Sequence, residues 1–210
     1  MARIRDVASA PSVSLPSCVL PNSVYNCKKS PRKHNKQMHD HHSLFLFASA
    51  AGTVRQVGPL IQGCLDAGWT TYVVGTPNVE LVTPTETLLD VPGAHWIRGY
   101  NQPPLDVFPF GTMLVAPCTF NTFNKLALGL ADNLATAMVA DAIGAGRPVF
   151  IAPSMNPGLW NHPRTRESVQ QLRAWGCTII GPQISASQVT MAPIEAILAA
   201  LRDHMQPDAP

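Results

Sequence analysis

One stretch near the middle of the chain limits the possible folds more than any other. A short apolar run, 112–116, ends at Pro117 and leads through a small polar cluster, 118–122, into a segment with helical apolar spacing. This order predicts a buried strand, a tight polar loop and a helix over 123–135 that continues through 143. The loop would lie where the amino end of the helix favours a phosphate, at the sheet edge where α/β proteins bind ligands.

The same alternation of apolar runs and helical segments recurs along the chain. Strands are predicted at 44–47, 69–74, 95–97, 148–152 and 177–180, and further helices at 54–67, 79–89, 163–175 and 193–204. Nearly continuous apolar strands are typical of a parallel sheet that is covered on both faces. The fold class is therefore expected to be α/β, a three-layer, doubly wound parallel sheet that is flavodoxin-like or Rossmann-like.

Two motifs in this framework resemble those of a known family. Segment 117–122, Pro-Cys-Thr-Phe-Asn-Thr, resembles a Pro-Ala-Ser-Ala-Asn-Thr signature, and the Gly-Leu-Ala-Asp-Asn-Leu run at 129–134 resembles the Gly-Ile-Ala-Asp-Asn-Leu run that follows it. Segment 153–160, Pro-Ser-Met-Asn-Pro-Gly-Leu-Trp, is similar to Pro-x-Met-Asn-x-x-Met-Trp. These are signatures of the homo-oligomeric flavin-containing cysteine decarboxylases, which include phosphopantothenoylcysteine and peptidyl-cysteine decarboxylases. The resemblance extends over 44–181.

The resemblance implies an FMN site built from loops that follow the strands. The cofactor-binding residues expected from it are Ser49, Gly52, Thr76, Pro117, Thr119, Phe120, Asn121, Thr122 and Met155. FMN is preferred over FAD because the motifs offer one monophosphate site and no paired glycine fingerprint for a pyrophosphate. The phosphate loop departs from the family, which has Gly where this chain has Ala48. Thr76 could instead close a turn before Pro77, and Met155 could fill a gap in the core.

Asn156 and Asn121 are the predicted catalytic residues. In the family, an Asn at position 156 binds the carboxylate of the substrate cysteine, and a neutral amide can hold a carboxylate without competing for its proton. The alternative for Asn156 is that it fixes its own loop through hydrogen bonds to the backbone. No metal ligand set is expected.

Two departures from the family concern catalysis. Decarboxylating members carry a His about fourteen residues before the first Pro of the signature, where this chain has Pro103. His95 lies earlier in the sequence, and Tyr100, Gln102 and Asp106 are the other polar candidates nearby. The segment 183–190, where the family has a substrate-covering flap, contains neither Gly nor Cys.

Three functions therefore stay open. The first is FMN-dependent oxidative decarboxylation of a cysteine, expected to be a carboxyl-terminal peptidyl cysteine, giving an enethiol. The second is a flavin-binding protein of the same family without decarboxylase activity, with a regulatory, structural or other redox role. The third is decarboxylation of phosphopantothenoylcysteine, which in the family ends with reduction by a flap cysteine. The expected partners are a cysteine-containing peptide or small-molecule substrate and other copies of the chain in a trimer or dodecamer.

Composition narrows the cellular context. Apolar residues form 46% of the 210 residues and charged residues 13%, which suits a large core and surfaces buried between copies. The net charge of +2 favours no particular partner, and the mild acidity of the chain after residue 42 argues against nucleic-acid binding. Five scattered cysteines favour a reducing, cytoplasmic location, and no apolar run is long enough to suggest a membrane span.

The first part of the chain is expected to stand apart from the domain. Residues 1–42 are basic, polar and aperiodic, which predicts a disordered or loosely attached tail before a flavoprotein domain at 43–210. A transit peptide, a translation start at Met38 and a metal-binding cluster at 39–42 are the alternatives.

Overall fold

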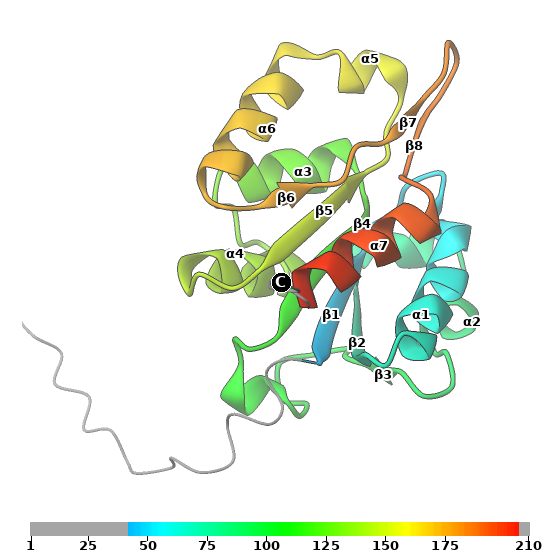
Figure 1. Ribbon diagram of the computed structural model, residues 1–210, viewed down its shortest axis with the longest axis vertical. Helices are drawn as coiled ribbons and strands as arrows, with labels where there is room; N and C mark the ends of the chain where they lie inside the picture. The colour runs from blue at the N-terminus through cyan, green and yellow to red at the C-terminus, as the bar shows by residue number, and fades with distance from the viewer. Residues whose placement is uncertain (1–41, 206–210) are drawn as a thin grey trace, which may run out of the picture. The chain divides into compact units, whose positions relative to one another are not determined.

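The computed structural model describes residues 42–205, except for the Thr87 side chain, and the predicted tail lies outside this range apart from His42. Six parallel strands form the main sheet in the order β3-β2-β1-β4-β5-β6 (Figure 1). They are β1 (Ser43–Ala48), β2 (Thr70–Gly75), β3 (His95–Trp96), β4 (Thr112–Cys118), β5 (Val149–Pro153) and β6 (Thr178–Ile179). The predicted doubly wound parallel sheet is confirmed.

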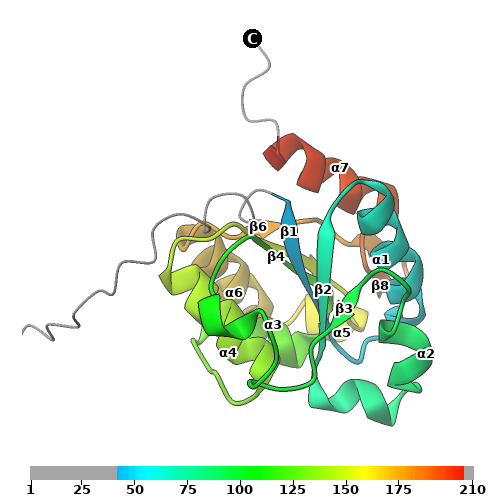
Figure 2. The ribbon, with the colours of Figure 1, turned by 90° about the horizontal axis from the view of Figure 1, so that it is seen from below.

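Helices connect the strands and cover both faces of the sheet. The α-helices are α1 (Val57–Asp66), α2 (Thr85–Leu89), α3 (Phe120–Ala127), α4 (Leu134–Gly144), α5 (Pro157–Trp160), α6 (Pro163–Ala174) and α7 (Ile194–Met205). Three short 3₁₀ segments are η1 (Val54–Gln56), η2 (Pro77–Leu81) and η3 (Leu105–Val107). Helices α1, α2 and α7 lie on one side of the sheet, and α3, α4 and α6 lie on the other (Figure 2).

The alternation of side chains along β1 explains why both faces need covering. Leu44 and Leu46 contribute to the core under α1 and α7, whereas Phe45 and Phe47 contribute to the core under α3, α4 and α6. All four side chains are at most 1% exposed. Full burial of such a side chain contributes about 1.5–3 kcal/mol relative to exposure, so both layers stabilise the central strand.

The strand order creates a topological switch point beside β1. The chain builds β1, β2 and β3 outward in one direction and then crosses back to place β4 on the other side of β1. The connections that leave β1 and β4 therefore run to opposite faces of the sheet and open a crevice at their carboxyl ends. Ligands of doubly wound proteins bind in this crevice.

The predicted continuous helix from 123 to 143 is wrong. Helix α3 begins earlier, at Phe120, and ends near Gly129, whose φ of 68° favours glycine and turns the chain out of the helix. Helix α4 then starts afresh with a capping box, in which Asn133 accepts from the Thr136 N–H and the Thr136 hydroxyl accepts from the Asn133 N–H. Leu130, predicted on the apolar helix face, lies in the connection and is half exposed.

Two other segments differ from the sequence prediction. The helix expected at 79–89 is split into η2 and α2, because Pro84 cannot donate the N–H that a continuous helix needs at this point. The segment 183–190, where the family has its flap and no strand was predicted, forms an antiparallel hairpin of β7 (Gln183–Ile184) and β8 (Val189–Thr190). The Met155 N–H donates to the Val189 carbonyl at 3.2 Å, which joins the hairpin to the loop after β5.

No helix among residues 42–205 is both long and apolar enough to cross a membrane.

Candidate functional site

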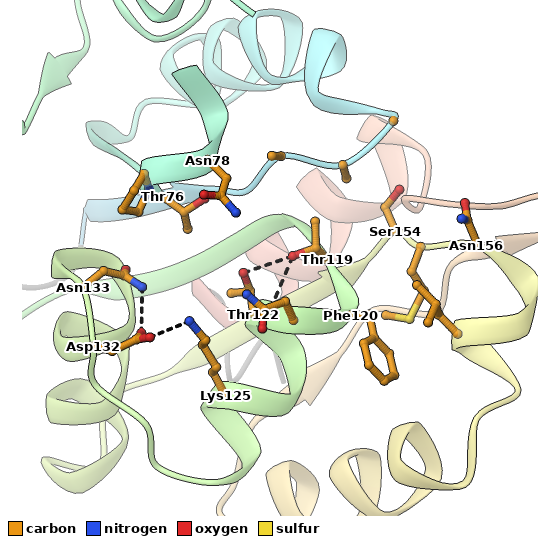
Figure 3. Close-up of a pocket in the computed structure, with 17 residues that line it drawn as sticks. Thr76, Asn78, Thr119, Phe120, Thr122, Lys125, Asp132, Asn133, Ser154 and Asn156 are labelled. Carbon is orange, nitrogen blue, oxygen red and sulfur yellow. Dashed lines mark hydrogen bonds and ion pairs between the residues drawn. The ribbon is translucent and has the colours of Figure 1, made fainter. Parts of the chain in front are cut away.

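A cavity of about 500 Å³ opens at the carboxyl ends of β1, β2, β4 and β5 (Figure 3). The loop after β1, the turn after β2, the start of α3, the α3–α4 connection and the loop after β5 all contribute to it. Its lining residues are Ala50, Ala51, Gly52, Thr76, Pro77, Asn78, Thr119, Phe120, Asn121, Thr122, Lys125, Asp132, Asn133, Ser154, Met155, Asn156 and Leu159. The cavity therefore lies at the switch point of the sheet, and seven of the nine predicted cofactor residues line it, together with Asn156.

The first turn of α3 forms one wall of the cavity. Thr119 is the N-cap residue, and its hydroxyl accepts from the Thr122 N–H at 3.4 Å and donates to the Thr122 hydroxyl at 3.1 Å. The N–H groups of Phe120 and Asn121 follow directly, and first-turn N–H groups have no acceptor within their own helix. This wall presents backbone donors and the positive end of a helix dipole to the cavity.

Ser49 and Pro117, both predicted to bind the cofactor, do not line the cavity. The Ser49 hydroxyl is buried, donates to the Pro117 carbonyl at 2.7 Å and accepts from the Thr119 N–H at 2.9 Å. Pro117 belongs to β4, and its carbonyl also accepts from the Ser49 N–H. The structure therefore gives both residues a supporting position, holding the loop after β1 against the start of α3.

Thr76 and Gly52 both line the cavity. Thr76 precedes η2, and its backbone carbonyl closes the turn by accepting from the Val79 N–H. The Thr76 hydroxyl makes no capping bond to η2, so the turn-closing alternative does not account for it. Gly52 faces open space, since a Cβ built there would meet no atom within 4 Å. Both residues leave room for a ligand group.

Met155 and Asn156 follow β5 and form the opposite wall. Met155 is partly buried, packs against the core under α3 and also lines the cavity, so both of its predicted roles fit its position. Asn156 is the N-cap residue of α5, but its side chain makes no capping hydrogen bond. The exposed amide is therefore not engaged by its own helix and is accessible from the cavity.

An ion pair between Lys125 of α3 and Asp132 of the α3–α4 connection also lines the cavity. Neither residue was among the predicted site residues. Lys125 Nζ donates to Asp132 Oδ2 at 2.5 Å, and Asp132 Oδ1 accepts from the Asn133 amide and the Thr136 hydroxyl. The hydrogen bond and charge of Lys125 hold the pKa of the Asp132 carboxyl below its usual range. Among residues 42–205, Lys125 and Asp132 are the only charged ones that line this cavity, and their charges cancel.

The polar candidates of the 95–106 region lie away from the cavity. His95 stacks on Tyr72, with ring centroids 5.2 Å apart. The Gln102 side-chain oxygen accepts from the N–H groups of Arg98 and Gly99. Neither these two residues nor Tyr100 or Asp106 lines the cavity within the described chain.

The buried cysteines are expected to be unreactive in the native protein. Burial raises the pKa of the Cys64 thiol to about 12, that of Cys177 to about 11, and that of Cys118 still further. In a variant with Cys18→Ser and Cys27→Ser, Ellman's reagent at pH 8 should label none of the three thiols within minutes, because the thiolate is the attacking form. All three should react after unfolding in guanidinium chloride. Rapid labelling of the folded variant would contradict this expectation.

Two curated proteins are similar in sequence to part of this chain. Phosphopantothenoylcysteine decarboxylase of Mus musculus is 38% identical over 97 residues, which cover 43% of this chain and 47% of that protein. The bifunctional coenzyme A biosynthesis protein CoaBC of Thermococcus kodakarensis is 33% identical over 136 residues, 65% of this chain and 31% of that protein. The chain thus spans less than half the length of these relatives.

A solved structure named the FMN binding protein AtHal3 has the same fold, with a TM-score of 0.69 at 23% identity, over 81% of this chain and all of that one. The sequence profile of the family called Flavoprotein matches residues 32–206, which is most of the chain. The match includes every loop that lines the cavity, and the protein belongs to the Flavoprotein family.

Proposed function

We propose that the cavity binds FMN and that the protein decarboxylates a cysteine with the bound flavin as electron acceptor. The observation that carries the proposal is the convergence of the α3 amino end, the Thr76 turn and the Asn156 loop on one cavity. A volume of about 500 Å³ lies within the usual range for ligand pockets, roughly 300–1,000 Å³. The fit to FMN also rests on the chemistry of the lining groups.

The lining suits a phosphate that is held by neutral donors. The paired charges of Lys125 and Asp132 leave the cavity without net charge, so binding of an anion would depend on backbone N–H groups and hydroxyls. The N–H groups of Phe120 and Asn121, the Thr76 hydroxyl and the open backbone at Gly52 are the groups we assign to FMN. A monophosphate needs only one such cluster, which favours FMN over a dinucleotide.

Asn156 would hold the substrate and set its orientation. Its amide N–H can donate to the carboxylate of a cysteine that enters beside Met155, and Asn121 offers a second exposed amide on the facing wall. Bound FMN would accept the two electrons that the oxidation removes from the cysteine. The Asn156 amide would keep the carboxylate ionised, which is the form that leaves as carbon dioxide.

The substrate is proposed to be phosphopantothenoylcysteine, with a peptide ending in cysteine as the second candidate. Relatives that are named phosphopantothenoylcysteine decarboxylases favour the first. The segment 183–190 has no cysteine, so no thiol in that hairpin can reduce the product. We therefore expect either substrate to end as an enethiol, having lost carbon dioxide and two hydrogens.

A flavin-binding protein without decarboxylase activity is the alternative function. It is favoured by Pro103, which stands where the resembling family has its acid–base His, since proline cannot transfer a proton. No His lines the cavity within the described chain. A decarboxylase and a flavin-binding protein without this activity differ in whether the cysteine substrate is converted to a product.

The test begins with FMN binding and ends with the product. Purified protein should quench the fluorescence of added FMN on binding and then convert phosphopantothenoylcysteine to a product that mass spectrometry identifies by the loss of carbon dioxide and two hydrogens. A peptide ending in cysteine, and the same peptide ending in serine, complete the panel. FMN binding without turnover of either cysteine substrate would establish the alternative, and the absence of FMN binding would contradict both.

Assembly into a homo-oligomer is part of the proposal. Leu128 and Leu130 are 56% and 48% exposed on the α3–α4 connection, beside the Asp132–Asn133 segment that lines the cavity. Burying these leucines against another copy would remove apolar surface from water at the edge of the site. The two exposed leucines therefore support contact with another copy of the chain at this edge of the site.

A further inference from the structure

The three loops around the proposed substrate site are joined by buried hydroxyl groups. Ser49 joins the loop after β1 to the start of α3, through the Pro117 carbonyl and the Thr119 N–H. Thr53, four residues later, donates from its hydroxyl to the Ser154 hydroxyl at 2.9 Å. The loop after β1 is therefore hydrogen-bonded to the loops that follow both β4 and β5.

The Thr53–Ser154 bond spans a strand of the sheet. Strand β4 lies between β1 and β5, so backbone hydrogen bonds of the sheet cannot connect the loops after β1 and β5 directly. The bond links residues that are 101 positions apart in the sequence. It provides a direct connection between these two walls of the cavity, over the carboxyl end of β4.

Burial strengthens the hydrogen bond between Thr53 and Ser154. Thr53 is 8% and Ser154 4% exposed, and a hydrogen bond shielded from water gains electrostatic strength. The Ser154 N–H is also fixed, because it donates to the Cys118 carbonyl at 2.9 Å. Ser154 lines the cavity beside Asn156 on the loop that leaves β5 (Figure 3). A shift of Ser154 would move Asn156 with it, since only Met155 separates them.

We propose that Thr53 and Ser154 are positioning residues that set the distance between the cofactor loop at Gly52 and the substrate amide of Asn156. The inference rests on the proposed function, in which Gly52 faces FMN and Asn156 holds the carboxylate. Thr53 does not line the cavity, so Thr53→Val breaks the hydroxyl pair and leaves every lining side chain in the protein. The variant lacks only the hydrogen bond that holds the Asn156 loop at a fixed distance from the cofactor loop.

The direct test uses Thr53→Val and Ser154→Ala, alone and together, at saturating FMN. Each single variant should raise the substrate KM about tenfold, the effect of losing one buried hydrogen bond, with kcat within about twofold of the wild type. The double variant should resemble the singles, because both remove the same bond. Thr53→Ser keeps the hydroxyl and should restore the wild-type KM.

Two matched controls separate positioning from a general loss of stability. Thr71→Val removes a buried hydroxyl on β2 that donates to the Trp69 carbonyl, and Ser168→Ala removes one on α6 that donates to the Asn124 side chain. Neither residue lines the cavity. Both controls should lower stability while leaving the KM unchanged. A KM rise in the controls equal to that in Thr53→Val would overturn the inference.

Hydrogen exchange gives a readout that needs no substrate or FMN. The Leu159 and Trp160 N–H groups both donate to the Asn156 carbonyl at 3.0 Å and report on this loop. Thr53→Val, distant in sequence, should speed exchange of these two amides at least fivefold relative to Thr71→Val. Unchanged exchange in Thr53→Val would overturn the inference, whether or not the protein is a decarboxylase. Faster exchange in a protein that shows no decarboxylase activity would count against the proposed function alone.

Discussion

Replacing Asn156 with alanine is expected to lower kcat/KM for the cysteine substrate about 100-fold and to leave the FMN dissociation constant unchanged. The effect follows from loss of a hydrogen bond to a charged carboxylate, which typically contributes about 1.5–3 kcal/mol. The fold should tolerate the change, because the side chain is exposed and does not cap α5. Initial rates and FMN fluorescence titration on the same preparation measure the two quantities.

Three further variants sharpen this experiment. Asn156→Asp keeps the shape but places a negative charge against the substrate carboxylate, so its loss should be at least as large. Asn161→Ala changes an exposed asparagine at the other end of α5 that does not line the cavity, and it should behave as the wild type. Thr76→Val should weaken FMN binding without changing the KM at saturating FMN. Wild-type kcat/KM in Asn156→Ala would remove Asn156 from the mechanism.

The largest expected loss of stability comes from Gly111→Ala, which should lower the free energy of unfolding by about 4 kcal/mol. Gly111 has a φ of 70°, a conformation that costs a residue with a Cβ about 1–2 kcal/mol. A Cβ there would also overlap the backbone carbonyl of Ser43, at the start of the central strand. Backbone cannot move aside as a flexible side chain can, so β1 and the entry to β4 would have to separate.

Gly146→Ala is the matched control for this prediction. Gly146 has a φ of 67°, but a Cβ there would meet no atom within 4 Å. Urea unfolding followed by circular dichroism should give a loss of about 1–2 kcal/mol for Gly146→Ala. The difference between the variants isolates the overlap with Ser43. Equal losses would show that the overlap relaxes without cost.

The sheet could be predicted because each strand is marked by the residues of its own short segment. Each central strand contains a short apolar run, such as 113–116 in β4, and parallel topology follows once both faces of the sheet are apolar. The cavity was predictable for a related reason. Parallel strands bring their carboxyl ends to one edge, so the polar residues after β2, β4 and β5 had to meet there.

What the sequence did not reveal depends on contacts between distant residues or on single backbone angles. Ser49 was expected to bind cofactor, but its hydroxyl bonds with Pro117 and Thr119, about seventy positions later, which no local pattern records. The break between α3 and α4 had a usable signal, since Gly129 and Asn133 are residue types that end and begin helices. The apolar spacing of 126, 130 and 134 outweighed that signal.

The β7–β8 hairpin gives the protein a place where substrate preference can change at little structural cost. Its base is fixed to the cavity wall by the backbone bond between Met155 and Val189, whereas the turn from Ser185 to Gln188 is exposed and closed by its own hydrogen bonds. Substitutions or insertions in that turn would alter the exposed surface of the hairpin and leave the sheet intact. Divergence among related proteins is therefore expected to concentrate there and to spare the strand that anchors it.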